Sequence, residues 1–242
     1  MHEQHSRTEM LIGTDGVAKL ASARVAVFGV GGVGGYAAEA LARAGVGSID
    51  LIDSDVVSLS NINRQIIATH LTLGMYKTEA MRDRIMSINP EARVKCHNVF
   101  FDEGSKNSFD FGSYDYVIDA IDSLSAKVEL IATAKASDCE IISAMGAGNK
   151  LDPTRFEVAD ISKTTVCPLA RAVRIALRKR GINHLKVVYS KEPPVVVSET
   201  AEGEKKRVPA SISFVPSAMG LILAGEVIKS IAFGEKTEEK ID

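Results

Sequence analysis

The chain has little cysteine, and its three cysteines are far apart. Cys96, Cys139 and Cys167 are the only ones among 242 residues, and none forms a CxxC pair. This excludes a four-cysteine zinc site and argues against a disulfide framework. Few unpaired cysteines are typical of a reducing compartment, so we expect a cytoplasmic protein.

The chain also lacks a net charge of either sign and a long apolar run. Lys and Arg number 29 and Asp and Glu number 31, giving a net charge of −2. A globally basic nucleic-acid coat is therefore excluded, although a local basic face is not. Charged side chains interrupt the first 23 residues, so no signal-peptide core is expected. The uncharged stretch 25–38 contains five glycines and is too short to span a bilayer, so we expect no membrane segment.

Short apolar segments alternate with helical patterns over the first 150 residues. Strands are predicted at 24–29, 48–53, 93–99, 116–119 and 140–144, and helices at 33–44, 75–89 and 125–137. Buried strands separated by helices pair in parallel through right-handed crossovers. The pattern therefore predicts an α/β fold with a doubly wound, mostly parallel, Rossmann-like sheet.

The second half of the chain is less regular. It predicts strands at 155–159 and 186–190, helices at 168–180 and 217–232, an exposed charged loop at 198–207 and a fraying charged tail at 233–242. We interpret residues 1–242 as one domain. Its nucleotide-binding half covers residues 1–150, and a substrate-facing part covers residues 151–232.

A glycine-rich loop lies between the first predicted strand and the first helix. Gly29, Gly31 and Gly34 have the spacing GxGxxG, and Gly32 adds a fourth glycine. Glycines allow a tight turn and close approach to a phosphate, while the helix N-terminus supplies free N–H groups. The loop therefore predicts nucleotide binding; the alternative is a strand-to-helix turn that binds nothing.

Two carboxylates follow the second predicted strand. Asp53 ends that strand 24 residues after Gly29, where an acid can accept hydrogen bonds from both ribose hydroxyls. Taken alone, this pattern indicates NAD. Asp55 is either a second nucleotide contact or a turn residue.

A polar and basic cluster then favours ATP over NAD. Asn61, Arg64 and Gln65 come after the second strand, and Lys77 follows 13 residues after Arg64. A dehydrogenase needs no such cluster, whereas departure of pyrophosphate from ATP needs positioned cations. Asp122 lies just beyond the strand 116–119, at the edge where such sheets bind ligands, and suits magnesium. Each residue alone could be a surface charge or loop cap; together they predict an ATP and magnesium site.

These segments carry a family resemblance over residues 7–150. GVGGVG, LIDSD, SNINRQ, Lys77 and the DAIDS stretch at 119–123 resemble the adenylating domain of ubiquitin-activating-type enzymes, including the thiamine and molybdopterin sulfur-carrier adenylyltransferases. The resemblance implies that the glycine loop around Gly31 holds the phosphates and that Asp53 holds the ribose. It assigns the triphosphate to Asn61, Arg64 and Lys77, and magnesium to Asp122, with room for a monovalent cation. It also implies a homodimer in which Arg7 reaches the ATP of the partner subunit.

The second half resembles the tRNA threonylcarbamoyladenosine dehydratases. The matching segments are Gly146–Gly148, Asp152–Thr154, Asp160, Lys163–Thr164 and Pro168–Arg171. The resemblance implies that a carboxylate on a modified tRNA base is adenylated and that loss of AMP then closes a ring. It also implies sulfur-relay proteins as partners.

One feature departs from that group. Many of its members carry a cysteine ahead of the last helix, but residues 209–217 contain none. We therefore expect no thioester at that position and interpret Cys167 as a packed small side chain. None of the five histidines has a metal-ligand spacing, and His70 is the only one near the predicted site.

A tRNA substrate needs phosphate contacts despite the small net charge. Five basic residues lie within ten consecutive positions of the predicted helix 168–180. Arg171, Arg174 and Arg178 are spaced by three and four, so a helix would place them on one stripe. The alternative is a solvated helix face. The candidates are Arg171, Arg174, Arg178, Lys179 and Arg180, with Lys205, Lys206 and Arg207 on the charged loop.

The sequence is therefore compatible with three functions. The motifs agree best with a tRNA-modifying dehydratase that uses Arg64, Lys77 and Asp122 as catalytic residues. The second is an adenylyltransferase that activates the C-terminus of a ubiquitin-like sulfur carrier protein. The third is an NAD-dependent oxidoreductase or a nucleotide-binding regulator.

Overall fold

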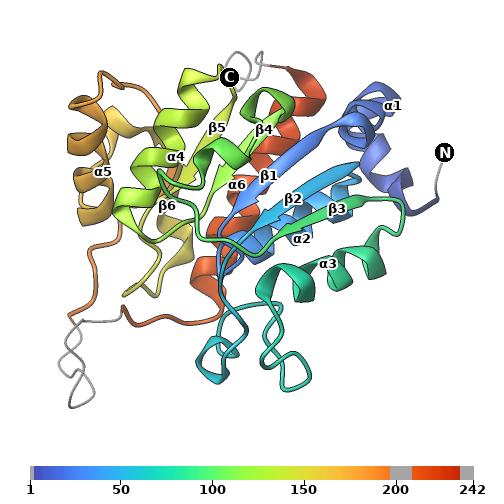
Figure 1. Cartoon of the computed structure of the whole chain (residues 1–242), viewed down its shortest axis with the longest axis horizontal. Helices are drawn as coiled ribbons and strands as arrows, with labels where there is room; N and C mark the ends of the chain where they lie inside the picture. Colours follow the sequence, from blue (N-terminus) through green and yellow to red (C-terminus); the bar gives the residue numbers. More distant parts are fainter. Residues whose placement is uncertain (1–2, 197–208, 235–242) are drawn as a thin grey trace.

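The computed structural model describes residues 3–196 and 209–234. A seven-stranded sheet with the order β3-β2-β1-β4-β5-β7-β6 runs through these residues (Figure 1). All neighbouring strands pair in parallel except β6, which is antiparallel to β7. The predicted doubly wound, mostly parallel sheet is therefore confirmed. The strands are β1 (Arg24–Phe28), β2 (Ser48–Ile52), β3 (Arg93–His97), β4 (Tyr116–Asp119), β5 (Ile141–Ala144), β6 (Phe156–Asp160) and β7 (Lys186–Ser190).

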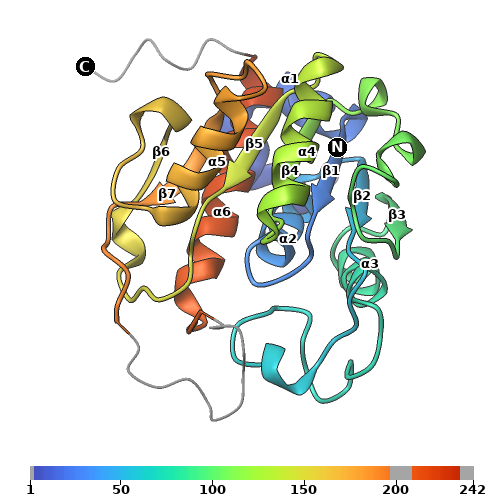
Figure 2. The same cartoon turned by 60° about the vertical axis from the view of Figure 1, so that its left-hand side comes forward.

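Helices cover both faces of the sheet. Figures 1 and 2 show α6 on the face opposite α4 and α5. Alternation along β1 divides the core in the same way. Val25 and Val27 belong to the hydrophobic cluster under α2 and α6, whereas Ala26 and Phe28 belong to the cluster under α4 and α5. The helices are α1 (Ser6–Ser22), α2 (Gly34–Ala44), α3 (Lys77–Ile88), α4 (Leu124–Ala136), α5 (Pro168–Arg178) and α6 (Phe214–Phe233).

Most predicted elements are present with ends shifted by one to three residues, but α1 is not predicted by the sequence. Glycines at 13 and 16 weaken its helical pattern, and Gly13 lies outside helical geometry with φ of 75°. The helix is nevertheless retained because residues such as Leu20 are buried against the core. The predicted loop 198–207 lies outside the described residues, as does the predicted tail 233–242 beyond residue 234.

Helix α6 starts three residues earlier than predicted. Pro216 sits in its first turn, where a missing N–H costs no helical hydrogen bond. Within the described ranges, α6 is the one helix whose length and composition would suit a membrane span. In the structure, Met219, Leu223 and Val227 are fully buried at helical spacing, and α6 packs against α1 and α2. Its apolar character is thus used in the core.

Candidate active site

A cavity of about 830 Å³ opens at the carboxyl ends of β1, β2, β4 and β5. The strand order reverses between β1 and β4, which is the place where open α/β sheets bind ligands. Most residues predicted to bind the nucleotide line this cavity. They are Gly29, Gly31, Gly32, Asp53, Asp55, Asn61, Arg64, Gln65, Lys77 and Asp122.

Two positions of the glycine loop have no room for a side chain. Gly29 has a φ of 89°, and a Cβ there would lie 2.6 Å from the carbonyl oxygen of Ala120. A Cβ on Gly34 would lie 1.8 Å from the carbonyl oxygen of Gly29. Gly34 does not line the cavity, so its place in the structure is in packing at the start of α2. The loop thus presents backbone, rather than side chains, at a helix N-terminus.

Asp53 is the first residue after β2 and joins the strand to the glycine loop. Its Oδ2 accepts a hydrogen bond from the N–H of Val30 at 2.7 Å, and its Oδ1 accepts one from the N–H of Asp55 at 2.9 Å. Burial raises the pKa of Asp53, while the Lys77 ammonium and these two amides oppose that rise. The carboxylate is therefore desolvated but held in one orientation beside the loop.

Lys77 is the first residue of α3, and its ammonium is buried. Its Nζ lies 2.6 Å from Oδ2 of Asp55 and 3.9 Å from Oδ2 of Asp53. A main-chain bridge between Val56 and Tyr76 brings the two ends of the intervening segment together. Figure 1 shows the segment between β2 and α3 below the sheet. The Lys77 N–H also donates to the carbonyl of Asp55 at 3.0 Å. The segment between β2 and α3 thus places the Lys77 ammonium at the cavity in a fixed position.

Arg64 and Gln65 lie over the glycine loop. The Nη1 of Arg64 donates to the carbonyl oxygen of Ser60 and to Oδ1 of Asn63, both at 2.9 Å. A Cβ on Gly32 would lie 3.4 Å from Cγ of Arg64, so the arginine stem passes close to the loop. The side chain of Gln65 is buried, and its Oε1 has no hydrogen-bond partner among the described residues. A buried acceptor of this kind suits a donor on a bound ligand.

Asn61 has a structural partner as well as a place on the cavity wall. Its Oδ1 accepts a hydrogen bond from the N–H of Ser58 at 3.1 Å, as part of a capping box. The amide nitrogen of Asn61 is therefore the part of this side chain available to a phosphate. This arrangement explains why an asparagine, with both an acceptor and a donor, suits the position.

Asp122 lies in the turn after β4 and is exposed on the cavity wall. Within residues 3–196 and 209–234, its carboxylate makes no hydrogen bond or ion pair, and no group of three acidic, His or Cys side chains could hold a metal alone. Magnesium at nucleotide sites keeps several waters and binds one or two carboxylates plus phosphates. One free carboxylate beside the phosphate loop fits that chemistry.

Sequence reasoning missed the importance of Asp119 in the same turn. Asp119 is fully buried, and its Oδ2 accepts hydrogen bonds from Nζ of Lys127 at 2.8 Å and from Oγ of Ser143 at 2.5 Å. Its Oδ1 accepts from the N–H of Ile121 at 3.1 Å. This buried network holds the turn that carries Asp122. The sequence signal that could have indicated this role is that Asp119 is a charged residue of the DAIDS motif at the end of a predicted strand.

A second part of the cavity wall was also missed. It comprises the turn after β5, the start of α5 and the apolar residues Val99 and Phe100. Cys167 belongs to this wall and is buried, and its Sγ accepts from the N–H of Ala170 at 3.5 Å. This agrees with the interpretation of Cys167 as a packed small side chain. Lys150 also lines this wall and carried no sequence signal.

Arg7 does not line the cavity of its own chain. It is exposed on α1, and the nearby His5 ring lies against Gly45, at the end of α2 remote from the glycine loop. Any contact of Arg7 with a nucleotide must therefore involve a different copy of the chain or a different arrangement of α1.

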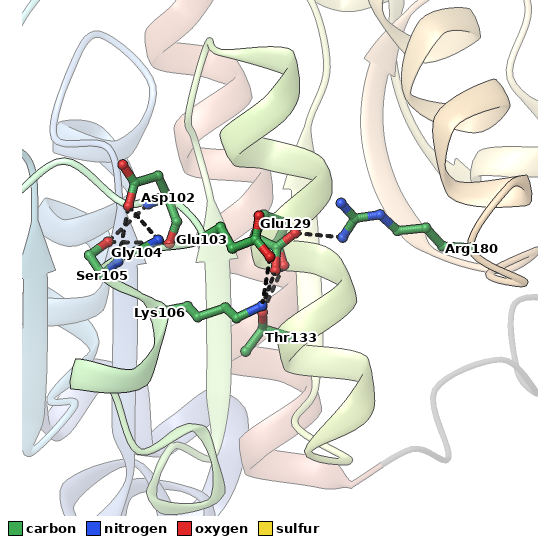
Figure 3. A network of polar contacts seen from close by, with 8 residues as sticks. All are labelled: Asp102, Glu103, Gly104, Ser105, Lys106, Glu129, Thr133 and Arg180. Atoms are coloured by element: carbon green, nitrogen blue, oxygen red, sulfur yellow. Dashed lines mark hydrogen bonds and ion pairs between the residues drawn. The ribbon is translucent and has the colours of Figure 1, made fainter.

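The basic residues of α5 do not form the predicted single stripe. Arg174 turns inward and donates to Oγ1 of Thr164 at 2.6 Å. Figure 3 shows Arg180 bound to Glu129, which also binds Lys106, at 2.6 Å and 2.7 Å. These two cations lower the pKa of Glu129, so Arg180 is partly neutralised. Among the described residues, the exposed basic side chains of this group without such partners are Arg171 in the first turn of α5, Arg178 at its end and Lys179 just beyond it.

Comparison with known proteins covers nearly the whole chain. The model of the ThiF family matches residues 5–241. The tRNA threonylcarbamoyladenosine dehydratase of Bacillus subtilis is 45% identical over 96% of this chain and 95% of that protein. The crystal structure of E. coli tRNA N6-threonylcarbamoyladenosine dehydratase, TcdA, in complex with ATP is 34% identical, with a TM-score of 0.86 over 95% of this chain and 93% of that chain.

A sulfur-carrier type of relative matches a smaller part. The adenylyltransferase and sulfurtransferase UBA4 of Vanderwaltozyma polyspora is 37% identical, but over 57% of this chain and 31% of that protein.

Proposed function

Because the chain belongs to the ThiF family, we propose that it is an ATP-dependent tRNA threonylcarbamoyladenosine dehydratase. It adenylates the carboxylate of the threonylcarbamoyl group in tRNA and then dehydrates it to the cyclic form. The observation that carries this proposal is the cavity in which Asp53, Arg64, Lys77 and Asp122 meet beside the glycine loop. Similarity over nearly the full length to dehydratases of that name supports it.

Adenylation activates the carboxylate, which is otherwise a poor electrophile because its leaving group would be an oxide. In the first step a carboxylate oxygen bonds to the α-phosphorus of ATP, and the bond to pyrophosphate breaks. In the second, a nucleophile within the substrate attacks the acyl carbon, AMP leaves and the nucleophile's proton goes to solvent. Because the nucleophile belongs to the substrate, the enzyme contributes position and charge neutralisation.

The residues that line the cavity have separate roles in binding ATP and in neutralising charge. The Asp53 carboxylate accepts hydrogen bonds from the ribose hydroxyls, and the glycine loop holds the phosphates. Arg64 and Lys77 stabilise charge as pyrophosphate departs. Asp122 holds magnesium, which when bound neutralises phosphate charge.

The proposal extends to a homodimer, in which Arg7 contributes to the site of the other copy. The position of Arg7 outside its own cavity supports this extension. The proposal also includes a cytoplasmic location, which rests on the few unpaired cysteines. A bound monovalent cation and contact with sulfur-relay proteins rest on the family resemblance alone.

The tRNA face is proposed along the exposed side of α5, from its first turn to just beyond its last residue. Arg171, Arg178 and Lys179 supply charges there that are not bound to other described residues. Phosphate contacts release counterions, so tRNA affinity should fall steeply as salt rises. Arg171→Ala combined with Arg178→Ala should lower that salt dependence, whereas Arg174→Ala should act mainly on stability.

Nucleotide-dependent turnover tests the proposal directly. Pyrophosphate should be released when ATP meets tRNA that carries threonylcarbamoyladenosine, and unmodified tRNA should give none. Release stimulated by a ubiquitin-like carrier protein instead would favour the sulfur-carrier adenylyltransferase. Thermal protection by NAD without protection by ATP would favour an oxidoreductase or a regulator.

A further inference from the structure

Beyond the nucleotide-binding residues the cavity has a second arm. The turn after β5, the start of α5 and the segment before α6 form it. The lysine and arginine side chains that line the whole cavity, among the described residues, are Arg64, Lys77 and Lys150. Arg64 and Lys77 belong to the nucleotide end, so Lys150 is the cation of the second arm.

Lys150 is only 4% exposed, and its ammonium is bound by main chain rather than by a carboxylate. Its Nζ donates to the carbonyl oxygen of Glu192 at 2.6 Å. The Glu192 carboxylate instead accepts the N–H groups of Leu151 at 2.9 Å and Asp152 at 3.0 Å. No carboxylate of the described residues lies within ion-pair distance of Lys150. An ammonium has three N–H donors, so the single acceptor among the described residues leaves donors for a ligand.

A comparison within the same chain shows how unusual this is. Lys127 is also buried, and there a carboxylate, that of Asp119, lies 2.8 Å from the ammonium. Among the described residues no carboxylate is in direct contact with Lys150; burial lowers its pKa, and the more distant Glu192 carboxylate opposes that shift only in part. A buried ammonium without a carboxylate in contact is unfavourable, and an anion that binds in the cavity would offset that cost.

The turn that carries Lys150 is tied down on two sides. Asn149 adopts a φ of 57°, and its Oδ1 accepts from the N–H of Ala210 at 2.7 Å. The N–H of Asn149 donates to the carbonyl of Ala210 at 2.7 Å, and its carbonyl accepts from Val195 at 2.8 Å. The cation is therefore presented by a held backbone, as a binding site requires.

We propose that Lys150 binds the carboxylate of the threonylcarbamoyl substrate and holds it against the α-phosphate of ATP, an inference that rests on the proposed function. The two reacting groups are both anionic, so they repel each other unless a cation lies beside the carboxylate. When one carboxylate oxygen bonds to the α-phosphorus and pyrophosphate leaves, the other becomes the acyl carbonyl oxygen. Lys150 keeps its hydrogen bond to that oxygen and polarises the carbonyl for ring closure.

The test compares two forms of one tRNA on the full protein with a non-hydrolysable ATP analogue present. One form carries the free carboxylate and the other its methyl amide. The wild-type protein should bind the carboxylate form about tenfold or more tightly, which is the effect of one charge-assisted hydrogen bond. Lys150→Gln and Lys150→Met should lose this preference while keeping their affinity for the ATP analogue. Lys135→Gln, an exposed lysine on α4 outside the cavity, should behave as the wild type.

Two outcomes would overturn the inference. The first is a Lys150→Gln protein that still prefers the carboxylate form. The second is a parallel loss of affinity for both tRNA forms and for the ATP analogue, with lower thermal stability, which is the signature of a structural role. Absence of pyrophosphate release by the wild-type protein would overturn the proposed function itself, and the wild-type assay separates that failure from one at Lys150.

Discussion

The Nζ of Lys77 lies 2.6 Å from Oδ2 of Asp55, 22 residues earlier in the chain. The two side chains differ sharply in exposure, since Lys77 is 8% exposed and Asp55 is 66% exposed. The pair thus joins a buried cation at the cavity to a carboxylate at its solvent side. The ion pair holds the Lys77 ammonium in place, so we expect any effect of Asp55 on a nucleotide to pass through Lys77.

A double-mutant cycle tests this relationship. Lys77→Ala should slow adenylation about 10²-fold, by analogy with the loss of one fixed donor. Asp55→Ala should have a smaller effect, because a solvent-facing ion pair contributes about 1 kcal/mol or less. In the Lys77→Ala background, Asp55→Ala should change nothing further. Additive effects in single-turnover adenylation would mean instead that Asp55 contacts the nucleotide itself.

Arg64→Ala should reduce adenylation far more than ATP binding. The glycine loop can still hold the ground-state phosphates, but the charge that develops as pyrophosphate leaves needs a fixed cation. We expect a loss of about 10²–10³ in single-turnover rate. Arg82→Ala, which removes an arginine paired with Asp83 outside the cavity, is the matched control. An Arg64→Ala protein that adenylates at the wild-type rate would show that the site is wrongly assigned.

Asp53→Asn should weaken ATP binding. Each charge-assisted hydrogen bond to a ribose hydroxyl contributes roughly 1.5–3 kcal/mol. Asparagine also removes one of the two oxygens that accept the N–H groups of Val30 and Asp55, so thermal stability should fall as well. Calorimetric titration with ATP and thermal unfolding at pH 7 provide the two readouts. Unchanged ATP affinity would refute the ribose assignment.

Mixing two inactive variants tests whether Arg7 serves the other copy. Arg7→Ala and Arg64→Ala should each lose activity in homodimers. Hybrid dimers contain one site with both arginines intact, so subunit exchange should restore part of the activity. If exchange is demonstrated by mass spectrometry and activity stays absent, each copy works alone.

Acid sensitivity should depend on Asp50, at the centre of β2. Burial raises its pKa, but hydrogen bonds from His97 and Arg24 outweigh this and hold the value at about 2. Because the folded pKa lies below the unfolded value, the ionised carboxylate stabilises the fold above pH 4, and this stabilisation is lost as pH falls towards 2. It amounts to about 2 kcal/mol at neutral pH.

Asp50→Asn should therefore unfold more easily than the wild type at pH 7, and the difference should shrink as pH falls from 5 to 2. Urea unfolding at several pH values measures it. A difference that stays constant over this range would mean that the loss comes from packing and not from the charge.

The local features of this protein follow from its sequence. β1 is recognisable because four of its five residues are apolar and buried, on both faces of the sheet. The glycine loop is recognisable because its spacing of glycines lies within six consecutive residues. The sheet order after residue 150 does not follow from the alternating pattern, because β6 pairs antiparallel to β7 although α5 lies between them in the chain. Helix α1 was missed since its stability comes from packing rather than from its own pattern.

The site divides in the same way. Asp53, Arg64, Lys77 and Asp122 stand in short motifs that the sequence displays, and the fold brings them to one cavity. The direction and burial of a side chain depend on partners far along the chain, so patterns alone could not predict them. Arg174 binds Thr164 instead of facing solvent, Asp119 meets Lys127 inside the core, and Lys150 is bound by main chain 42 residues away. The sequence by itself determined which chemistry is present, through local spacing, and only the tertiary structure decided which charges are neutralised, because that depends on long-range packing.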